Sequence, residues 1–147
     1  MLRQRLVSSS FASSYGNRLA KGVRSVVRTN ADLVEEIGTR AKAWGVREGL
    51  TGTPREIGTL DHAYAKRLLD RYQRMFGDRG LVTERSFIGG LEVPYGSKGS
   101  VRLDVLDVNT GAVWDYKFGT TPMSAAQRLK ILTNGPGVTS ITPVMRP

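Results

Sequence analysis

The stretch Ser100–Gly119 constrains the fold more than any other part of the chain, because it predicts two short strands joined by a tight turn. Its flanks carry the β-branched and aromatic residues that strands favour. The segment Val108–Gly111 supplies turn residues, and its glycine can take the left-handed conformation that closes a four-residue loop. A symmetric loop places Asp104 opposite Asp115, with Cβ atoms about 4.5–5.5 Å apart. A three-residue loop with a glycine bulge would instead shift this pairing by one residue.

Lys117 follows Asp115 by two residues, so it projects from the same face of the predicted strand. Two carboxylates that meet across a hairpin can hold Mg²⁺, a hard cation that prefers oxygen ligands. A lysine beside them can orient water and counter developing charge. We therefore expect Asp104, Asp115 and Lys117 to form a phosphodiester-cutting site at the surface of the strands. Arg102 shares the face of Asp104 and would either hold phosphate or balance charge.

The charge balance of the chain predicts a polyanionic partner. The 147 residues suggest one domain and carry a formal net charge of +9, with a pI of about 10.4. Such a charge favours nucleic acid, with a generally basic surface or an acidic protein partner as alternatives. The lack of cysteine excludes disulfides and thiolate zinc sites. The single histidine, His62, excludes mechanisms that need two imidazoles, and we expect it to be a surface or packing residue.

Residues 1–55 are expected to form a basic N-terminal helical extension or a linker. Basic and serine residues dominate the first part, and no acidic residue precedes Asp32. This composition fits a mitochondrial transit peptide, a linker from a longer protein or a basic arm that touches phosphate. Residues 30–45 predict a helix that ends at Gly45, and residues 47–58 predict a loop.

Residues 59–76 predict the strongest helix, with Thr59 as its N-terminal cap. Apolar residues recur every four positions and define the face expected to pack on the core: Leu60, Tyr64, Leu68, Tyr72 and Phe76, widened by Leu69 and Met75. Lys66, Arg67 and Arg71 lie largely off this stripe. They are candidate nucleic-acid-binding residues, or else the solvated face of a core helix.

Downstream of this helix the pattern predicts strands at 81–88 and 138–144, a loop at 89–99 and a helix at 124–134. Together with the hairpin, the chain then runs helix, three strands, helix, strand. No internal repeat interrupts this order. The predicted fold class is therefore a mixed α/β domain.

This order, with Asp104 on the second strand and Asp115-Tyr116-Lys117 on the third, resembles the PD-(D/E)xK nuclease superfamily. The resemblance implies a restriction-endonuclease-like core, assigned to residues 56–147, behind an N-terminal helical extension. It also implies an endonuclease that depends on Mg²⁺ or Mn²⁺. The chain departs from the pattern at Leu103, which stands where the name-giving proline would be.

The same resemblance implies further site residues. Members often carry an upstream acidic ligand, for which Glu84 is the choice and Asp61 and Asp70 are alternatives. The helix that follows the third strand often carries a glutamine facing the site, and Gln127 matches in position. The implied metal ligands are therefore Asp104, Asp115 and Glu84.

The strings GSVRLDVLDVNTG, VWDYKFG and NGPGVTSITPV resemble the C-terminal toxin domains of bacterial polymorphic toxins, such as Rhs-type, contact-dependent and type VI secretion effectors. This resemblance implies a nuclease toxin fused to a delivery protein at its N-terminal side and acting on DNA in the cytoplasm of a competing bacterium. It also implies an immunity protein that inhibits the toxin in the producer, expected to be acidic. Two alternatives are an RNase on the same fold and a non-catalytic module that binds nucleic acid.

Overall fold

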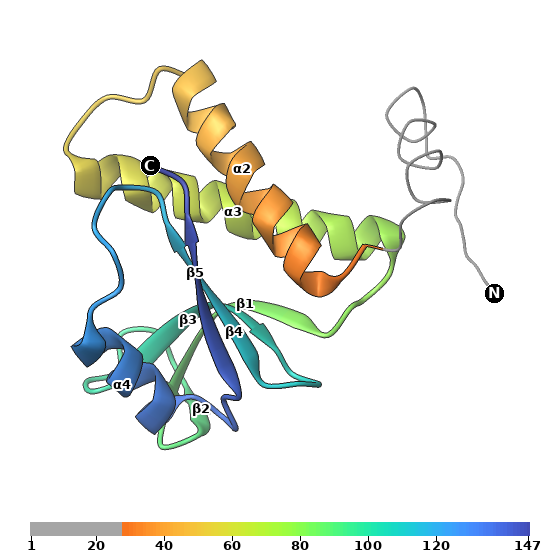
Figure 1. The fold of residues 1–147 in the computed structure, drawn as a ribbon, viewed down its shortest axis with the longest axis vertical. Coiled ribbons are helices and arrows are strands. Elements are labelled where there is room, and N and C mark those ends of the chain that lie inside the picture. The colour runs from red at the N-terminus through yellow and green to blue at the C-terminus, as the bar shows by residue number, and fades with distance from the viewer. Residues whose placement is uncertain (1–27) are drawn as a thin grey trace. The chain divides into compact units, whose positions relative to one another are not determined.

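The computed structural model describes residues 28–147 (Figure 1). The predictions for the basic arm or leader at residues 1–27 lie outside these described residues. Within these residues, Val34–Pro147 form one compact unit, which contains the whole sheet. Between residues 28 and 147, no helix combines the length and the apolar character that a membrane crossing requires.

The sheet has five strands in the spatial order β2-β1-β3-β4-β5. The elements follow one another as α2 (Asn30–Arg47), α3 (Pro54–Phe76), β1 (Leu81–Ile88), β2 (Leu91–Val93), β3 (Val101–Asp107), β4 (Ala112–Lys117), α4 (Ala125–Asn134) and β5 (Ser140–Met145). Neighbouring strands are antiparallel except β4 and β5, which are parallel and joined through α4. The predicted mixed α/β class is confirmed. The loop predicted at 89–99 is wrong in part, because it contains the short edge strand β2.

Helices cover both faces of the sheet (Figure 1). On one face, the hydroxyl of Tyr116 donates to the carbonyl oxygen of Val34 in α2. On the other face, Ile131 of α4 packs in one apolar cluster with Val113 and Leu103. Since alternate residues of a strand point to opposite faces, Asp115 and Lys117 share the α4 face with Val113.

Helix α3 begins at Pro54, so the start predicted at Thr59 and the loop predicted up to Gly58 are wrong. Thr53 is the N-cap: its side chain accepts from the backbone N–H of Glu56, whose carboxylate accepts in return from the N–H of Thr53. This capping box fixes the first turn. Proline suits the first helical position because its missing N–H would have no partner there. Likewise α2 continues to Arg47, two residues past the predicted end at Gly45.

The buried residues of α3 are Asp61, Ala65 and Leu69, so of the predicted stripe only Leu69 is fully buried, while Tyr64, Leu68 and Tyr72 are half-buried. Leu60 and Phe76, at the two ends of that stripe, are exposed. The physical reason is close helix packing: a Cβ built on Gly45 of α2 would collide with Oδ1 of Asp61. A buried carboxylate on the contact face is something that apolar periodicity cannot predict.

The hairpin has the predicted symmetric register. Val105 pairs with Trp114 and Leu106 with Val113, an alignment that brings Asp104 level with Asp115. The carboxylate of Asp107 holds the turn, because it accepts from the backbone N–H groups of Asn109 and Thr110. The carbonyl oxygen of Asp107 also accepts from the N–H of Gly111, at 2.8 Å. Gly111 has φ of 81°, as the loop chemistry requires.

The ladder between β1 and β3 is interrupted at one row. Thr83 pairs with Val105 and Arg85 with Leu103, but Glu84 and Asp104 between them are skipped. Leu103 and Leu106 both join the α4-side cluster, although a separation of three residues puts side chains on opposite faces of a regular strand. Asp104 is therefore an irregular residue in β3. Glu84 in β1 carries the matching irregularity, with φ of 52°.

Replacing Gly45 with alanine should destabilise the protein. Glycine-to-alanine changes inside helices normally stabilise by about 0.5–1 kcal/mol. Here the added methyl meets the Asp61 carboxylate, and overpacking should lower the free energy of unfolding by about 1–3 kcal/mol. The matched control is Gly58→Ala in α3, where a Cβ has nothing within 4 Å and should be neutral or stabilising. Urea unfolding of both variants measures the difference, and equal stability of the two would contradict the packing argument.

Candidate active site

Lys117 is the centre of a cluster on the α4 side of the sheet. Its ammonium lies 2.8 Å from Oδ2 of Asp115 and donates to Oε1 of Gln127 at 3.0 Å. Gln127 sits in the first turn of α4, whose N-cap Ser124 accepts from the backbone N–H of Gln127. The cap therefore fixes the position of the glutamine, and the glutamine fixes the lysine. The structure thus brings together three of the residues chosen from the sequence.

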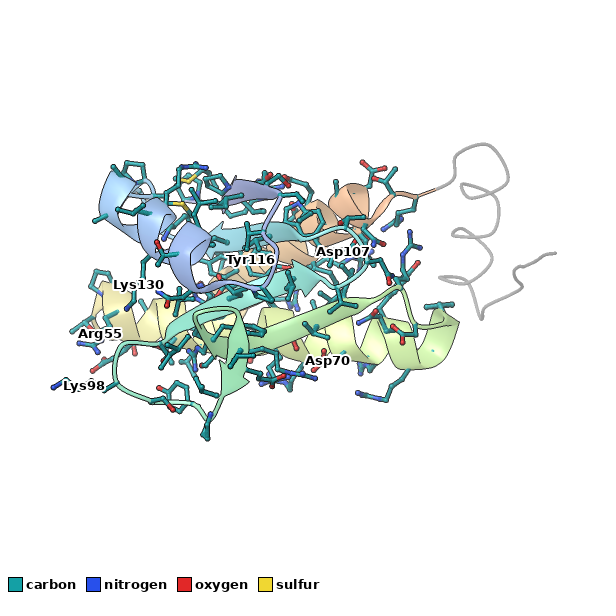
Figure 2. The ribbon with its side chains drawn as sticks, turned by 90° about the horizontal axis from the view of Figure 1, so that it is seen from below. Arg55, Asp70, Lys98, Asp107, Tyr116 and Lys130 are labelled. Atoms are coloured by element: carbon teal, nitrogen blue, oxygen red, sulfur yellow. The ribbon has the colours of Figure 1, made fainter. Side chains whose placement is uncertain are left out.

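Asp104 lies beside this cluster, where the pairing of β3 and β4 stops. Its Oδ2 accepts from the backbone N–H of Tyr116 at 2.8 Å and lies 3.2 Å from Nε2 of His62 in α3. The carboxylate therefore takes the place of a strand partner for Tyr116. Tyr116 itself is buried between the helical layers and is labelled in Figure 2.

The two carboxylates are held from the two helical layers, Asp104 by His62 of α3 and Asp115 by Lys117 beside α4. This differs from the single-sided arrangement that regular alternation predicts, and the irregularity at Asp104 is the reason. The groups still interact electrostatically. Burial raises the pKa of Asp115, the charge of Asp104 raises it further, and the ammonium of Lys117 opposes both effects.

The site is also less exposed than expected. Only 10% of the Asp115 side chain and 19% of the Lys117 side chain are accessible, so the expectation of strand-surface positions is wrong. Buried charges are costly unless they are compensated. The lysine and aspartate therefore stabilise each other, and removal of either one alone would leave an uncompensated buried charge.

His62 takes part in this site, which the sequence did not predict. Its Nδ1 faces the carbonyl oxygen of Gly58 at 2.8 Å, and its Nε2 faces the carbonyl oxygen of Tyr116 at 3.1 Å. Carbonyl oxygens only accept, so both ring nitrogens must carry hydrogens and the ring is an imidazolium. Burial by itself lowers the pKa of His62, but the hydrogen bond and charge of Asp104, together with the two carbonyl groups, raise it to about 9.

Glu84 does not join Asp104 and Asp115. Its carboxylate lies 3.8 Å from the guanidinium of Arg102. Its φ of 52° is in the region that favours glycine, and such strain costs about 1–3 kcal/mol and is often found at functional sites. Within residues 28–147, no three side chains of Asp, Glu, His or Cys are close enough to share a metal ion.

The two alternative upstream acids lie elsewhere. Asp61 is buried against α2, and burial raises the pKa of its carboxyl group. Asp70 accepts from the ammonium of Lys66 at 2.8 Å and from the hydroxyl of Thr83 at 2.9 Å. Lys66 also donates to that hydroxyl at 3.0 Å, so it links α3 to β1. Asp70 and Lys66 therefore connect α3 to β1, and 42% of the Lys66 side chain is still accessible.

The other predicted nucleic-acid contacts are exposed. The guanidinium carbon of Arg67 lies 5.2 Å from the centre of the Tyr64 ring, which stacks on Trp44 of α2. Arg71 is exposed one turn further along α3. Both remain available on the outer surface of the helix.

The residues present fit a hydrated Mg²⁺ ion. Asp115 Oδ2 is buried and lies 2.8 Å from the ammonium of Lys117, which compensates its charge. Asp104 supplies a second carboxylate whose charge is felt at Asp115. Mg²⁺ keeps several waters and commonly uses one or two protein carboxylates. The donor chemistry of two carboxylates therefore suits this ion, although the two are held from opposite helical layers.

Comparisons with known proteins identify no relative. A scan against protein-family models, a search of curated proteins and a search of solved structures each returned no match to this chain.

The charge of His62 should make stability fall in alkaline solution. Its folded pKa of about 9 exceeds the ordinary value of 6.5, so the folded state binds the proton more tightly. The stabilisation is complete below about pH 6.5 and is lost as the pH rises through 9. Urea unfolding in a chelating buffer measures this loss, and His62→Gln should be less stable but nearly independent of pH over the same range. An NMR titration of the single histidine that gave a pKa at or below 6.5 would contradict it.

Proposed function

We propose that the chain is a metal-dependent nuclease that hydrolyses phosphodiester bonds in DNA. The observation that carries the proposal is the ammonium of Lys117, held between Asp115 and Gln127 with Asp104 alongside. Acidic, basic and amide groups of this kind, converging from a strand end and a helix N-terminus, are suited to phosphoryl transfer to water.

Each side chain has a defined task in the proposed reaction. Asp104 and Asp115 would hold Mg²⁺, which when bound supplies Lewis-acid polarisation of phosphate and water. Lys117 orients the attacking water and counters negative charge on the phosphate. Gln127 accepts from the lysine and keeps its ammonium in place. The Tyr116 N–H fixes the Asp104 carboxylate.

The element order supports a restriction-endonuclease-like core. Apart from the short strand β2, the chain runs α3, β1, β3, β4, α4, β5, with the first three of these strands antiparallel and the last one parallel to β4. This is the helix, three-strand, helix, strand order that the resemblance implies. The order alone does not specify chemistry, so the proposal depends on the site.

The toxin assignment is part of the same proposal and rests on the resemblance of the three sequence strings. We propose an effector domain that acts in the cytoplasm of a target cell and is inhibited by an immunity protein in the producer. A net charge of +9 favours an acidic inhibitor, because complementary charge speeds association.

One observation favours a second function, a non-catalytic module that binds nucleic acid. Both carboxylates already face a cation of the protein, His62 at Asp104 and Lys117 at Asp115. In such a module these pairs would only stabilise the fold, and the positive charge would bind phosphate without cutting it.

A plasmid assay separates the two functions. The wild-type protein should nick DNA in Mg²⁺ and stop on addition of a chelator. Lys117→Met should lower the rate by about 10²–10³-fold, because a positioned charge is lost from the transition state. Asp115→Asn should also abolish cutting while keeping the shape of the side chain.

The matched control is Lys130→Met, the same substitution at an exposed position of α4 (Figure 2). It should cut at the wild-type rate. If Lys117→Met and Lys130→Met cut at the same rate, Lys117 is not part of the active site. A wild-type protein that binds DNA with a steep salt dependence but never cuts would establish the binding module instead. An RNA substrate offered in parallel separates a DNase from an RNase.

A further inference from the structure

Tyr95 is the most exposed of the large hydrophobic side chains in residues 28–147, with 77% of its surface accessible. It sits in the loop between β2 and β3, and that loop is ordered by its own hydrogen bonds. The backbone N–H and the hydroxyl of Ser97 both donate to the carbonyl oxygen of Pro94, at 3.2 and 2.7 Å. The N–H of Ser100 then donates to the carbonyl oxygen of Ser97 at 3.1 Å. An aromatic ring is thus held at the surface by a defined turn.

Arg102 fixes one face of this ring. Its guanidinium carbon lies 4.6 Å from the ring centre, within the range of a cation–π contact. Arg102 belongs to β3 and precedes Asp104 by two residues, which is about 7 Å along a strand. Since the tyrosine is 77% exposed, its other face is open to solvent. The ring therefore contacts a residue two positions from Asp104 and presents one flat apolar surface to solvent.

The same loop carries a further cation. Lys98 is exposed and extends away from the body of the protein (Figure 2). An exposed aromatic ring flanked by basic side chains is the combination that single-stranded nucleic acid binds, because the bases stack and the phosphates pair with the cations. The bases of a duplex are already stacked on each other and would not offer a face to Tyr95.

We propose that Tyr95 stacks an unpaired base of single-stranded DNA beside the phosphate to be cut, with Arg102 supporting the ring and Lys98 contacting the neighbouring backbone. The proposal rests on the proposed function for the identity of the ligand and makes single-stranded DNA its substrate. Tyr95 becomes a specificity-determining residue, outside the group that performs the chemistry.

The test uses fluorescent single-stranded oligonucleotides in which one abasic position is moved along the strand. Binding is measured by anisotropy in a chelating buffer, so that it does not depend on cutting, and cleavage is measured separately in Mg²⁺. The variants are Tyr95→Ala, which removes the ring, and Tyr95→Phe, which keeps it. Leu91→Ala is the control, because Leu91 is an equally exposed apolar side chain of the neighbouring strand.

For the wild-type protein, loss of the base at one position should weaken binding by about 5- to 150-fold, the usual range for one base stacked on an aromatic ring. Tyr95→Ala should weaken binding of the intact strand by a similar factor and show no further loss at that abasic position. Tyr95→Phe and Leu91→Ala should match the wild type, and a duplex should bind Tyr95→Ala and wild type equally.

Three results would overturn the proposal. The first is that the protein does not bind single strands, and the second is that Tyr95→Ala binds the intact strand as tightly as the wild type does. The third is that Tyr95→Ala weakens binding by the same factor for every abasic strand, wherever the missing base lies. Failure of the proposed nuclease function would look different. In that case no strand is cut in Mg²⁺, while the position-specific effect of the abasic site on binding persists.

Discussion

The hydrogen bond from the backbone of Tyr116 to the carboxylate of Asp104 is the interaction on which the rest of the site depends. It lets β3 and β4 separate without leaving a buried N–H group unsatisfied, a loss that costs about 1–3 kcal/mol. The same carboxylate oxygen faces His62, so the end of the hairpin is tied to α3. The Asp104 side chain thus takes the place of a backbone partner for Tyr116 in β4 and also links the sheet to α3.

Each of the two helical layers helps to balance the negative charge of one carboxylate of the site. The α3 layer supplies the imidazolium of His62, and the α4 layer supplies Gln127, which holds the ammonium of Lys117. Each carboxylate of the site has a cation within 3.2 Å. Since an unpaired charge is costly to bury, loss of His62 or of Lys117 would leave its own carboxylate partner uncompensated.

The hairpin was predictable because its determinants are local: turn chemistry fixes loop length, and loop length fixes register. The start of α3 is local too, but the composition of residues 47–58 predicts a loop, whereas Pro54 is the first helical residue after the Thr53 cap. The contact face of α3 was not predictable in the same way. Asp61 lies on it because Gly45 of the neighbouring helix leaves room for a carboxylate, and that depends on how two helices cross.

The sequence by itself determined the mixed α/β class, the hairpin register and the proximity of Asp115 to Lys117, because spacing of two along a strand needs no knowledge of the rest of the chain. Only the tertiary structure decided that His62 faces Asp104, that the ladder breaks at Glu84, and that Arg102 lies against Tyr95. Each of these three features depends on residues from different elements of the fold. Their geometry is set by how helices and loops pack on the sheet, which no local pattern encodes.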